Sequence, residues 1–392
     1  MNYSQYTPAE QPAMTATSRH VFSIGLPASS SAAERRFPLT PEAVSILTER
    51  GFSVDIESGA GAPIHYTDNQ YAAAGARIVD RETALRRDIV IHLAAMKPVD
   101  IRRMRRGALL FTLLDLEHQS AESIRALLNQ GIVAIAIDLI QDRMGNTPFA
   151  DILSEIDGRA SIATASALLA DSVHGKGILL GGVAGVVACE VAILGSGIAA
   201  CAAARSAAGL GALVRMFDDD VYSLRRASRE LGPWLVGSSL HPRVLESALR
   251  TADVVIATPT ANPIAIDSTT ASLMKRGVIT FDLTAGHNTF PSIDHVDLAE
   301  ASPVDNSMAG TRRVCYTNAG SAVPRTAAMA LSDTFTTTLQ NLLSYDGVTN
   351  AIKLLPGLQK AVYTFLGKAV NADIAAIVNT RRVDINIYLT LS

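Results

Sequence analysis

The sequence has few cysteines, and they show no pattern that would join them through a disulfide or a metal ion. Cys189, Cys201 and Cys315 are odd in number, form no C-x-x-C pair and stand in apolar or helical surroundings. Disulfide frameworks and zinc sites need paired or closely spaced cysteines. We therefore expect neither of these and no other metal, and the composition suits the reducing environment of the cytoplasm.

An excess of charge of either sign is also lacking. The chain has 34 Lys and Arg against 37 Asp and Glu, which gives a formal net charge of −3 and a pI near 6.2. Proteins that bind nucleic acid or anionic membrane surfaces usually concentrate basic residues for the phosphate groups. We therefore expect neither nucleic acid nor a membrane as a partner.

No segment has the features of a signal peptide or of a membrane-spanning helix. The first twenty residues are polar and lack an apolar core, which predicts a disordered leader over residues 1–19. Residues 177–200 are almost entirely apolar and roughly long enough to span a bilayer. However, Glu190 divides this stretch and six glycines weaken a helix there. We expect two short buried pieces joined by a glycine-rich loop instead.

Apolar strand patterns alternate with helix patterns along most of the chain. A hydrophobic content of 48% is ample for buried parallel sheets. Strands that alternate with helices of ten or more residues predict an α/β fold with parallel sheets flanked by helices. The predicted strands cover residues 21–27, 52–56, 89–93, 108–114, 133–137, 191–194, 212–217, 254–257, 278–282 and 385–389; the predicted helices cover 41–50, 66–75, 121–130, 152–169, 199–208 and 324–343.

Residues 189–219 have the order of elements typical of a dinucleotide-binding βαβ unit. An apolar strand ends in a G-x-G-x-x-A turn at residues 195–200, and a helix of small residues follows. Gly195 permits the tight turn, Gly197 lets a pyrophosphate approach the backbone, and Ala200 keeps the helix close to the strand. The helix N-terminus offers free N–H groups to the phosphates. The alternative is a structural βαβ unit with a glycine-rich turn.

An acidic residue ends the second strand of this unit, as dinucleotide recognition requires. Asp218 is placed to accept hydrogen bonds from the ribose hydroxyls. Together with Asp219 and Asp220, it would repel a 2′-phosphate. This favours NAD(H) over NADP(H) as the cofactor.

Six motifs in order, from about residue 20 to the C-terminus, resemble those of the family of alanine dehydrogenases and transhydrogenase alpha subunits. They are R-F-P-L-T-P at 36–41, Y-A-A-A-G-A at 71–76, S-E-I-D-G-R at 154–159, G-G-V-A-G-V at 181–186, the nucleotide turn, and A-V-P-R-T at 322–326. The resemblance is closer to alanine dehydrogenase. It implies two Rossmann-like domains with a cleft between them: a discontinuous substrate domain from residues 20–148 and 326–392, and an NAD-binding domain over 149–325.

The resemblance also implies positions for the catalytic groups. Alanine dehydrogenases interconvert L-alanine with pyruvate and ammonia, with hydride passing to NAD. Their carboxylate-binding arginine matches Arg36, whereas their lysine falls at His92, with Lys97 as a candidate replacement. The acid/base histidine of the family falls at Asp115, and its nicotinamide-side aspartate falls at Gly286. Three of the four chemical positions therefore differ.

His92 and Asp115 each follow a predicted buried strand, and the resemblance places both strand ends at the cleft. Asp115 would then raise the pKa of His92 and orient its ring, which predicts a proton-carrying pair with Arg36 on the substrate carboxylate. The alternatives are a histidine bound by backbone groups and an aspartate that caps a turn or helix. Further expected contacts are Asn318 and Lys97 with the substrate, and Ser154, Ser196, Ile198, Thr258, Asp282 and His287 with the cofactor.

These features predict an NAD-dependent oxidoreductase for a small amino, keto or hydroxy acid. The second hypothesis is a catalytically degenerate NAD(H)-binding sensor or assembly partner, because the nucleotide unit is kept while a lysine and a histidine are lost. A transhydrogenase alpha-type subunit is a third, although residues 141–145 differ from the loop of that subunit. The resemblance further implies a homo-oligomer, a dimer or hexamer, with the helix over 327–343 as an interface.

Overall fold

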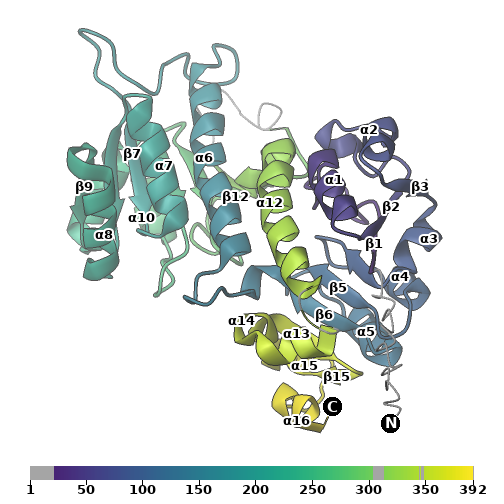
Figure 1. Cartoon of the computed structure of the whole chain (residues 1–392). Helices are drawn as coiled ribbons and strands as arrows, with labels where there is room; N and C mark the ends of the chain where they lie inside the picture. The colour runs from purple at the N-terminus through teal and green to yellow at the C-terminus, as the bar shows by residue number, and fades with distance from the viewer. Residues whose placement is uncertain (1–21, 303–312, 344, 346–347, 392) are drawn as a thin grey trace, which may run out of the picture.

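The computed structural model describes residues 22–302, 313–343, 345 and 348–391, so the predicted leader lies outside the described residues. The chain forms two α/β domains, each built on one sheet flanked by helices (Figure 1). Two long helices, α6 (Pro148–Ala170) and α12 (Pro324–Leu343), pack side by side between the two sheets (Figure 1). The predicted fold class is confirmed.

The first domain combines the two ends of the chain in one eight-stranded sheet. Its strand order is β15-β14-β6-β5-β4-β1-β2-β3, parallel except for β14 and β15 from the C-terminal part. Its strands are β1 Ser23–Leu26, β2 Ser53–Glu57, β3 Arg77–Val79, β4 Ile89–Ile91, β5 Leu109–Thr112, β6 Val133–Ala136, β14 Val362–Phe365 and β15 Lys368–Ala369. Its helices are α1 Pro41–Glu49, α2 Asp68–Ala73, α3 Arg81–Leu85, α4 Pro98–Arg103, α5 Ala121–Gln130, α13 Val348–Leu354, α14 Pro356–Ala361, α15 Ala372–Ile377 and α16 Ile385–Leu391.

The second domain is a seven-stranded, fully parallel sheet with the order β12-β13-β11-β10-β7-β8-β9. Its strands are β7 Glu190–Leu194, β8 Leu213–Phe217, β9 Leu235–Ser238, β10 Val254–Ala257, β11 Ile279–Asp282, β12 Asp294–Asp297 and β13 Val314–Thr317. Its helices are α7 Ile198–Gly209, α8 Val221–Leu231, α9 Pro242–Thr251 and α10 Ser268–Ser272, with a short 3₁₀ helix, η4, at Ala319–Ala322.

Small residues let α6 approach α7 at backbone distance. A Cβ added at Gly158 of α6 would lie 2.2 Å from the carbonyl oxygen of Ala199 in α7. Ala200 and Ala203 of α7 are fully buried. The absence of larger side chains at this crossing fixes α6 beside the nucleotide turn, and α6 is the helix over which the chain passes from the first domain to the second.

The helix over 324–343 occurs as predicted, but its apolar residues serve the core of the molecule. Leu331, Phe335 and Leu339 are fully buried in the first domain's main core. Thr336 and Thr338 donate hydrogen bonds to the carbonyls four residues before them, at 2.7 and 2.8 Å. The threonine-rich stretch therefore satisfies its own hydroxyls, and the expected interface is not needed to explain this helix.

Two local predictions were wrong. Residues 385–389 form the start of α16 and not a strand, because Asp384 accepts a 3.0 Å hydrogen bond from the Asn386 N–H and so caps the helix. In residues 177–200 the first piece is a loop in which Leu180 and Cys189 are buried but Val183 and Val187 are exposed; β7 and the first turn of α7 form the rest of the stretch. Within the described ranges, none of the helices has both the length and the apolar character needed to cross a membrane.

Candidate active site

Most of the predicted site residues stand in segments that directly follow parallel strands of the two sheets. β1, β4 and β5 of the first sheet lead into the segments with Arg36, His92 and Asp115. β7, β8 and β10 of the second sheet lead into the nucleotide turn, Asp218 and Thr258. Ligand sites in parallel α/β sheets form at such edges, where neighbouring loops diverge.

In the nucleotide turn, Gly195 is tightly packed against the protein, whereas Gly197 has free space beside it. Gly195 has φ +106°, and a Cβ there would lie 2.2 Å from the Thr258 hydroxyl oxygen. By contrast, a Cβ at Gly197 would find its nearest atom, the Pro259 carbonyl oxygen, only at 3.8 Å. Gly197 has φ −76°, which any residue adopts. The bare backbone at Gly197 is thus not required by the protein's own packing, and it leaves room for a pyrophosphate.

Asp218 lines a pocket beside this turn. Its Oδ2 accepts a 2.6 Å hydrogen bond from the Ser196 hydroxyl, and its Oδ1 accepts one of 2.9 Å from the Asp220 N–H. The pocket, of about 110 Å³, is lined by Asp218, Asp219, Asp220, Leu240, Thr260, Ala261 and Asn262. Ser196 thus orients Asp218 and contributes a buried hydroxyl, while each carboxylate oxygen keeps a lone pair for a ribose hydroxyl.

The other residues expected to contact the cofactor divide into exposed and internal ones. Ile198 is 44% exposed at the start of α7, and Ser154 is half-buried on α6. Thr258 is buried and donates a 2.9 Å hydrogen bond to the Leu194 carbonyl, so it supports the turn from inside. Asp282 is fully buried, and its carboxylate accepts hydrogen bonds from Thr284 and Thr289 of its own loop. Both carboxylate oxygens of Asp282 are thus engaged within their own loop, and its predicted contact with a cofactor stays a prediction.

Arg36 reaches the cleft already bound to a carboxylate. Its Nε and Nη2 donate to Glu34 Oε1 and Oε2 at 2.8 and 2.5 Å. Burial opposes the positive charge, but Glu34, Asp157 and Asp115 outweigh it and raise the pKa of Arg36. No described residue bonds to Nη1, so the end of the guanidinium formed by Nη1 and Nη2 remains able to hold a second carboxylate.

The predicted pairing of His92 with Asp115 is absent. His92 is buried, its Nδ1 donates to the Ala94 carbonyl at 2.7 Å, and its Nε2 accepts the Ser30 N–H at 3.1 Å. Burial lowers the pKa of His92, opposite to the expected direction. The backbone holds both ring nitrogens, so the alternative interpretation of His92 is correct.

Asp115 instead pairs with His118, for which no role was predicted. His118 Nδ1 contacts Asp115 Oδ1 at 2.8 Å, three residues along the same loop after β5. This hydrogen bond and the charge of Asp115 raise the pKa of His118. The His118 side chain is 75% exposed, and its Nε2 makes no hydrogen bond to the described residues. The i, i+3 spacing directly after a buried strand was the available signal.

A further carboxylate, Asp157 of α6, acts electrostatically on Arg36. Its Oδ1 accepts a 2.7 Å hydrogen bond from the Gly320 N–H, and a Cβ at Gly320 would lie 2.5 Å from that oxygen. Burial raises the pKa of Asp157, while Arg36, the Gly320 N–H and His287 oppose the shift. His287 thus lies near this site, with its Nδ1 3.1 Å from the Asp282 carbonyl oxygen. Asp157 belongs to the S-E-I-D-G-R motif at 154–159, but no role was predicted for it.

Two predicted substrate contacts, Asn318 and Lys97, differ in how the protein engages them. Asn318, at φ +53°, donates from Nδ2 to Asp297 Oδ2 at 2.7 Å and immediately precedes η4. Lys97 is exposed at the start of α4, and its Nζ makes no ion pair with the described residues. The predictions for Asn318 and Lys97 remain untested by this geometry.

Two family models together match most of the chain. The alanine dehydrogenase/PNT N-terminal domain matches residues 25–156, and the alanine dehydrogenase/PNT C-terminal domain matches residues 161–372. The chain belongs to the alanine dehydrogenase/PNT family. The boundary between the two matches falls inside α6, the helix over which the chain passes from one sheet to the other.

Individual relatives agree with the family match. The chain is 34% identical over 322 residues to an alanine dehydrogenase of Mycolicibacterium smegmatis, covering 79% of this chain and 84% of the relative. It is 30% identical to one of Mycobacterium tuberculosis, covering 90% and 95%. Among solved structures, an L-alanine dehydrogenase superposes with a TM-score of 0.80 at 27% identity, covering 91% of this chain and 99% of that one. A transhydrogenase from Sinorhizobium meliloti, at 20% identity and a TM-score of 0.70, shares the fold.

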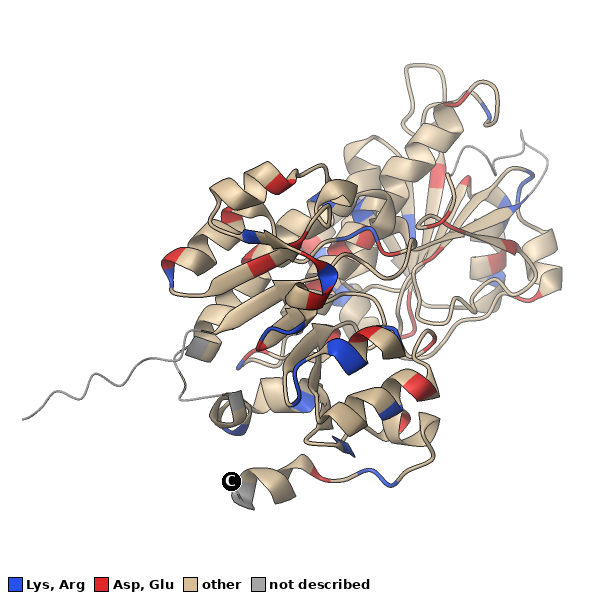
Figure 2. Cartoon of the chain, turned by 90° about the vertical axis from the view of Figure 1, so that its right-hand side faces the viewer, with Lys and Arg blue, Asp and Glu red and all other residues tan. Residues whose placement is uncertain are grey.

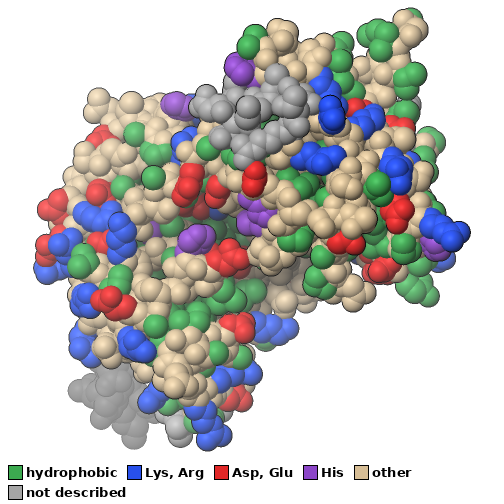
Figure 3. Space-filling view, turned by 180° about the vertical axis from the view of Figure 1, so that it is seen from behind, with side chains coloured by type: hydrophobic (Ala, Val, Ile, Leu, Met, Phe, Trp, Pro, Cys, Tyr) green, Lys and Arg blue, Asp and Glu red, His purple; other side chains and the backbone are tan. Residues whose placement is uncertain are grey.

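In this family member, acidic residues and histidines gather at the cleft. Basic and acidic residues are intermixed over both domains (Figure 2). Seen from behind, however, acidic and histidine side chains lie close together near the middle of the face, between the domains (Figure 3). The domains approach each other here, since a Cβ at Gly286 would lie 3.4 Å from Glu117 Oε1 across the cleft.

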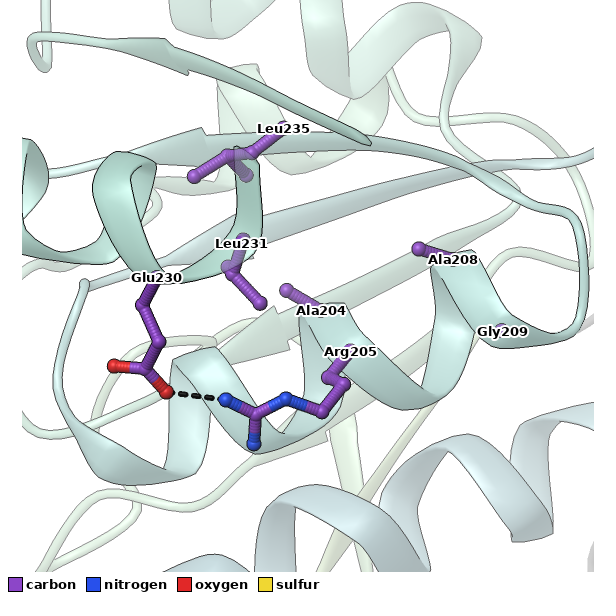
Figure 4. Close-up of a pocket in the computed structure, with 7 residues that line it drawn as sticks. All are labelled: Ala204, Arg205, Ala208, Gly209, Glu230, Leu231 and Leu235. Atoms are coloured by element: carbon purple, nitrogen blue, oxygen red, sulfur yellow. Dashed lines mark hydrogen bonds and ion pairs between the residues drawn. The ribbon is translucent and has the colours of Figure 1, made fainter. Parts of the chain in front are cut away.

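A pocket of about 310 Å³ lies away from this cleft, between α7, α8 and β9 (Figure 4). It is lined by Ala204, Arg205, Ala208, Gly209, Glu230, Leu231 and Leu235. Arg205 and Glu230 form an ion pair across it (Figure 4). None of the predicted site residues lines this pocket, so it carries none of the chemistry expected from the family.

Proposed function

We propose that this family member is an NAD(H)-dependent dehydrogenase that transfers hydride between the nicotinamide and a small amino or keto acid. One observation carries this proposal: an open nucleotide turn, the free end of the Arg36 guanidinium and the Asp115–His118 pair meet at a single cleft. The names of the relatives, alanine dehydrogenases, support an oxidoreductase of this type. They give no support to the sensor hypothesis.

The cofactor is bound by groups that the fold positions before the ligand arrives. The backbone at Gly197 and the first N–H groups of α7 face the pyrophosphate, and Asp218 holds the ribose hydroxyls. NAD⁺ supplies the hydride acceptor in the oxidative direction. The carboxylates of Asp218, Asp219 and Asp220 around the pocket disfavour a 2′-phosphate, so NAD(H) is preferred to NADP(H).

The substrate reaction follows from the remaining groups. Arg36 holds the substrate carboxylate with Nη1 and Nη2, while Glu34 fixes the orientation of the guanidinium. In the oxidative direction, Cα loses a hydride with both electrons of the C–H bond, and the ammonium nitrogen of the substrate loses one proton as the C=N bond of the iminium forms. The proton goes to Nε2 of neutral His118, and Asp115 stabilises the imidazolium. Water then replaces the nitrogen, which gives the oxo acid and ammonium.

Titration with NADH by calorimetry, followed by turnover measured at the NADH absorbance band, tests this proposal. Arg36→Ala should keep NADH affinity but remove activity with carboxylate substrates. His118→Ala should reduce turnover roughly a hundredfold, the usual contribution of general acid–base catalysis. The control is His174→Ala, because His174 forms a matching i, i+3 pair with Asp171 at 3.1 Å. Failure of the wild-type protein to bind NADH, or equal effects at His118 and His174, would contradict the proposal.

The predicted homo-oligomer also remains to be measured. The sequence corresponds to 41.4 kDa, so light scattering should give a multiple of this mass. A monomer at micromolar concentration would contradict the prediction.

A further inference from the structure

The groups around Arg36 carry more negative charge than a substrate with only a carboxylate and a reacting amino group would need. Glu34 already neutralises the guanidinium through two hydrogen bonds. The position where the family resemblance expects a lysine holds His92, whose ring is buried and engaged by backbone. The cleft therefore has less positive charge for a carboxylate than the predicted family site, with its arginine and its lysine, would have.

Negative charge is present in its place. The negative charges of Asp115 and Asp157 both favour the charged form of Arg36 and contribute to its raised pKa. Asp115 is balanced by His118, its partner at 2.8 Å. Asp157 uses Oδ1 to accept the Gly320 N–H, and its Oδ2 forms no hydrogen bond within the described part of the chain. On the α6 side of the cleft, Asp157 Oδ2 is thus an acceptor to which none of the described residues donates.

We propose that the substrate is an amino acid with a second positive charge on its side chain, and that Asp157 Oδ2 binds this charge. The inference rests on the function proposed above: the α-carboxylate lies on the free end of Arg36 and the α-nitrogen faces His118. A side-chain ammonium then satisfies the free oxygen and offsets the negative charge. A neutral side chain, as in alanine, would leave Asp157 unpaired beside the bound substrate.

Two pairs of amino acids with equal carbon skeletons test this proposal: L-ornithine against L-norvaline, and L-lysine against L-norleucine. Members of each pair differ by the terminal ammonium. We expect kcat/KM with NAD⁺ to favour the cationic member of at least one pair by roughly tenfold or more, the effect of one hydrogen bond to a charged group. Equal or reversed preference in both pairs would overturn the inference.

The variant Asp157→Asn separates the charge from the structural contact, because its amide oxygen still accepts the Gly320 N–H. It should abolish the preference within the pair while NADH affinity and Tm remain unchanged. The control is Glu155→Gln, two residues earlier on α6, where Glu155 pairs with the exposed Arg159 at 2.7 Å. A preference that survives Asp157→Asn, or that Glu155→Gln also removes, would contradict the role of Asp157.

Calorimetric titration of the NADH-bound protein with the same two pairs of amino acids measures how the side-chain charge affects binding when no catalysis occurs. If NADH binds but no amino acid is oxidised, the proposed function fails, whereas tighter binding of the cationic member would still support the inference. Binding of both members with equal affinity, or of neither, would overturn it.

Discussion

The two glycines of the nucleotide turn should separate folding from cofactor binding. Gly195 has φ +106°, and its added Cβ would lie 2.2 Å from the Thr258 hydroxyl, which holds the Leu194 carbonyl. Gly197 has an ordinary backbone conformation and 3.8 Å of clearance to the Pro259 oxygen. Gly195→Ala should therefore destabilise the domain, while Gly197→Val should fold normally and fail to bind NADH.

The magnitudes follow from the geometry. A side chain at positive φ costs about 1–3 kcal/mol, and forcing a methyl group into the packed space beside Thr258 costs about 1–3 kcal/mol more. We expect Gly195→Ala to lose roughly 2–6 kcal/mol of unfolding free energy. At Gly197 the valine side chain would displace the pyrophosphate from two or more N–H donors, each worth about 1.5–3 kcal/mol. The affinity for NADH should then fall by roughly a hundredfold or more.

Urea denaturation and NADH calorimetry on both variants provide the measurements. The reasoning fails if Gly197→Val binds NADH like the wild type, because the pyrophosphate would then lie elsewhere. It also fails if Gly195→Ala is as stable as the wild type, because the close approach to Thr258 would then be wrong. Gly209→Ala is the control, since Gly209 ends α7 with no atom near an added Cβ.

Three further predictions concern the cleft and the core. Asp218→Ala should weaken NADH binding roughly tenfold or more, because a hydrogen-bond acceptor and a negative charge are lost together. The ratio of NADH affinity to NADPH affinity should fall as well, and fluorescence titration with both nucleotides measures it. Unchanged affinities would place the ribose elsewhere. Asp115→Asn should move the acidic limb of the pH profile of oxidative kcat/KM to lower pH. Asp115 raises the pKa of His118, and only the neutral ring accepts the proton, so activity is lost as the pH falls through that pKa. An acidic limb that does not move would contradict His118 as the base. Asp55→Ala should cost about 3 kcal/mol of unfolding free energy, because buried Asp55 binds Arg77 and Arg87 at 2.8 and 2.6 Å. Loss of the exposed Glu155–Arg159 pair should cost under about 1 kcal/mol. Equal costs would show that burial of Asp55 adds nothing to the stability.

The parts of the fold that sequence could predict are those governed by periodicity. Long apolar alternation located most strands of the parallel sheets, and α5 (Ala121–Gln130) and α12 (Pro324–Leu343) have the predicted bounds. Short elements were missed, because three or four residues carry too little pattern. The edge strands β3 and β9 and the late strands β12 to β15 belong to this group. In α16 the buried residues Ile385 and Leu389 fit a helix, yet Ile385, Ile387 and Leu389 also fit an alternating strand.

The nucleotide half of the site was predictable for a physical reason. Its recognition depends on backbone, and the requirement for Gly195 and the position of Asp218 after β8 follow from local chain geometry. Side-chain contacts between distant segments have no such local determinant. Thr258 and Asp282 form hydrogen bonds that support the neighbouring loops from inside. These partners could not be predicted from the positions of the two residues after strands.

The substitution at residue 92 shows why the catalytic half was harder. A residue that follows a buried strand can turn toward the cleft or back into the domain, and the sequence does not distinguish the two. The loop over 27–33 brings the Ser30 N–H to His92 Nε2, and Ala94 supplies the acceptor for Nδ1, so the ring is held inside. After β5, by contrast, the side chains lie at the cleft. Asp115 adopts φ +37°, and this turn brings the His118 ring onto the Asp115 carboxylate. The aspartate and histidine paired at this cleft are therefore not the predicted Asp115 and His92: both come from one loop, and the pairing depends on a backbone turn that residue identity alone does not reveal.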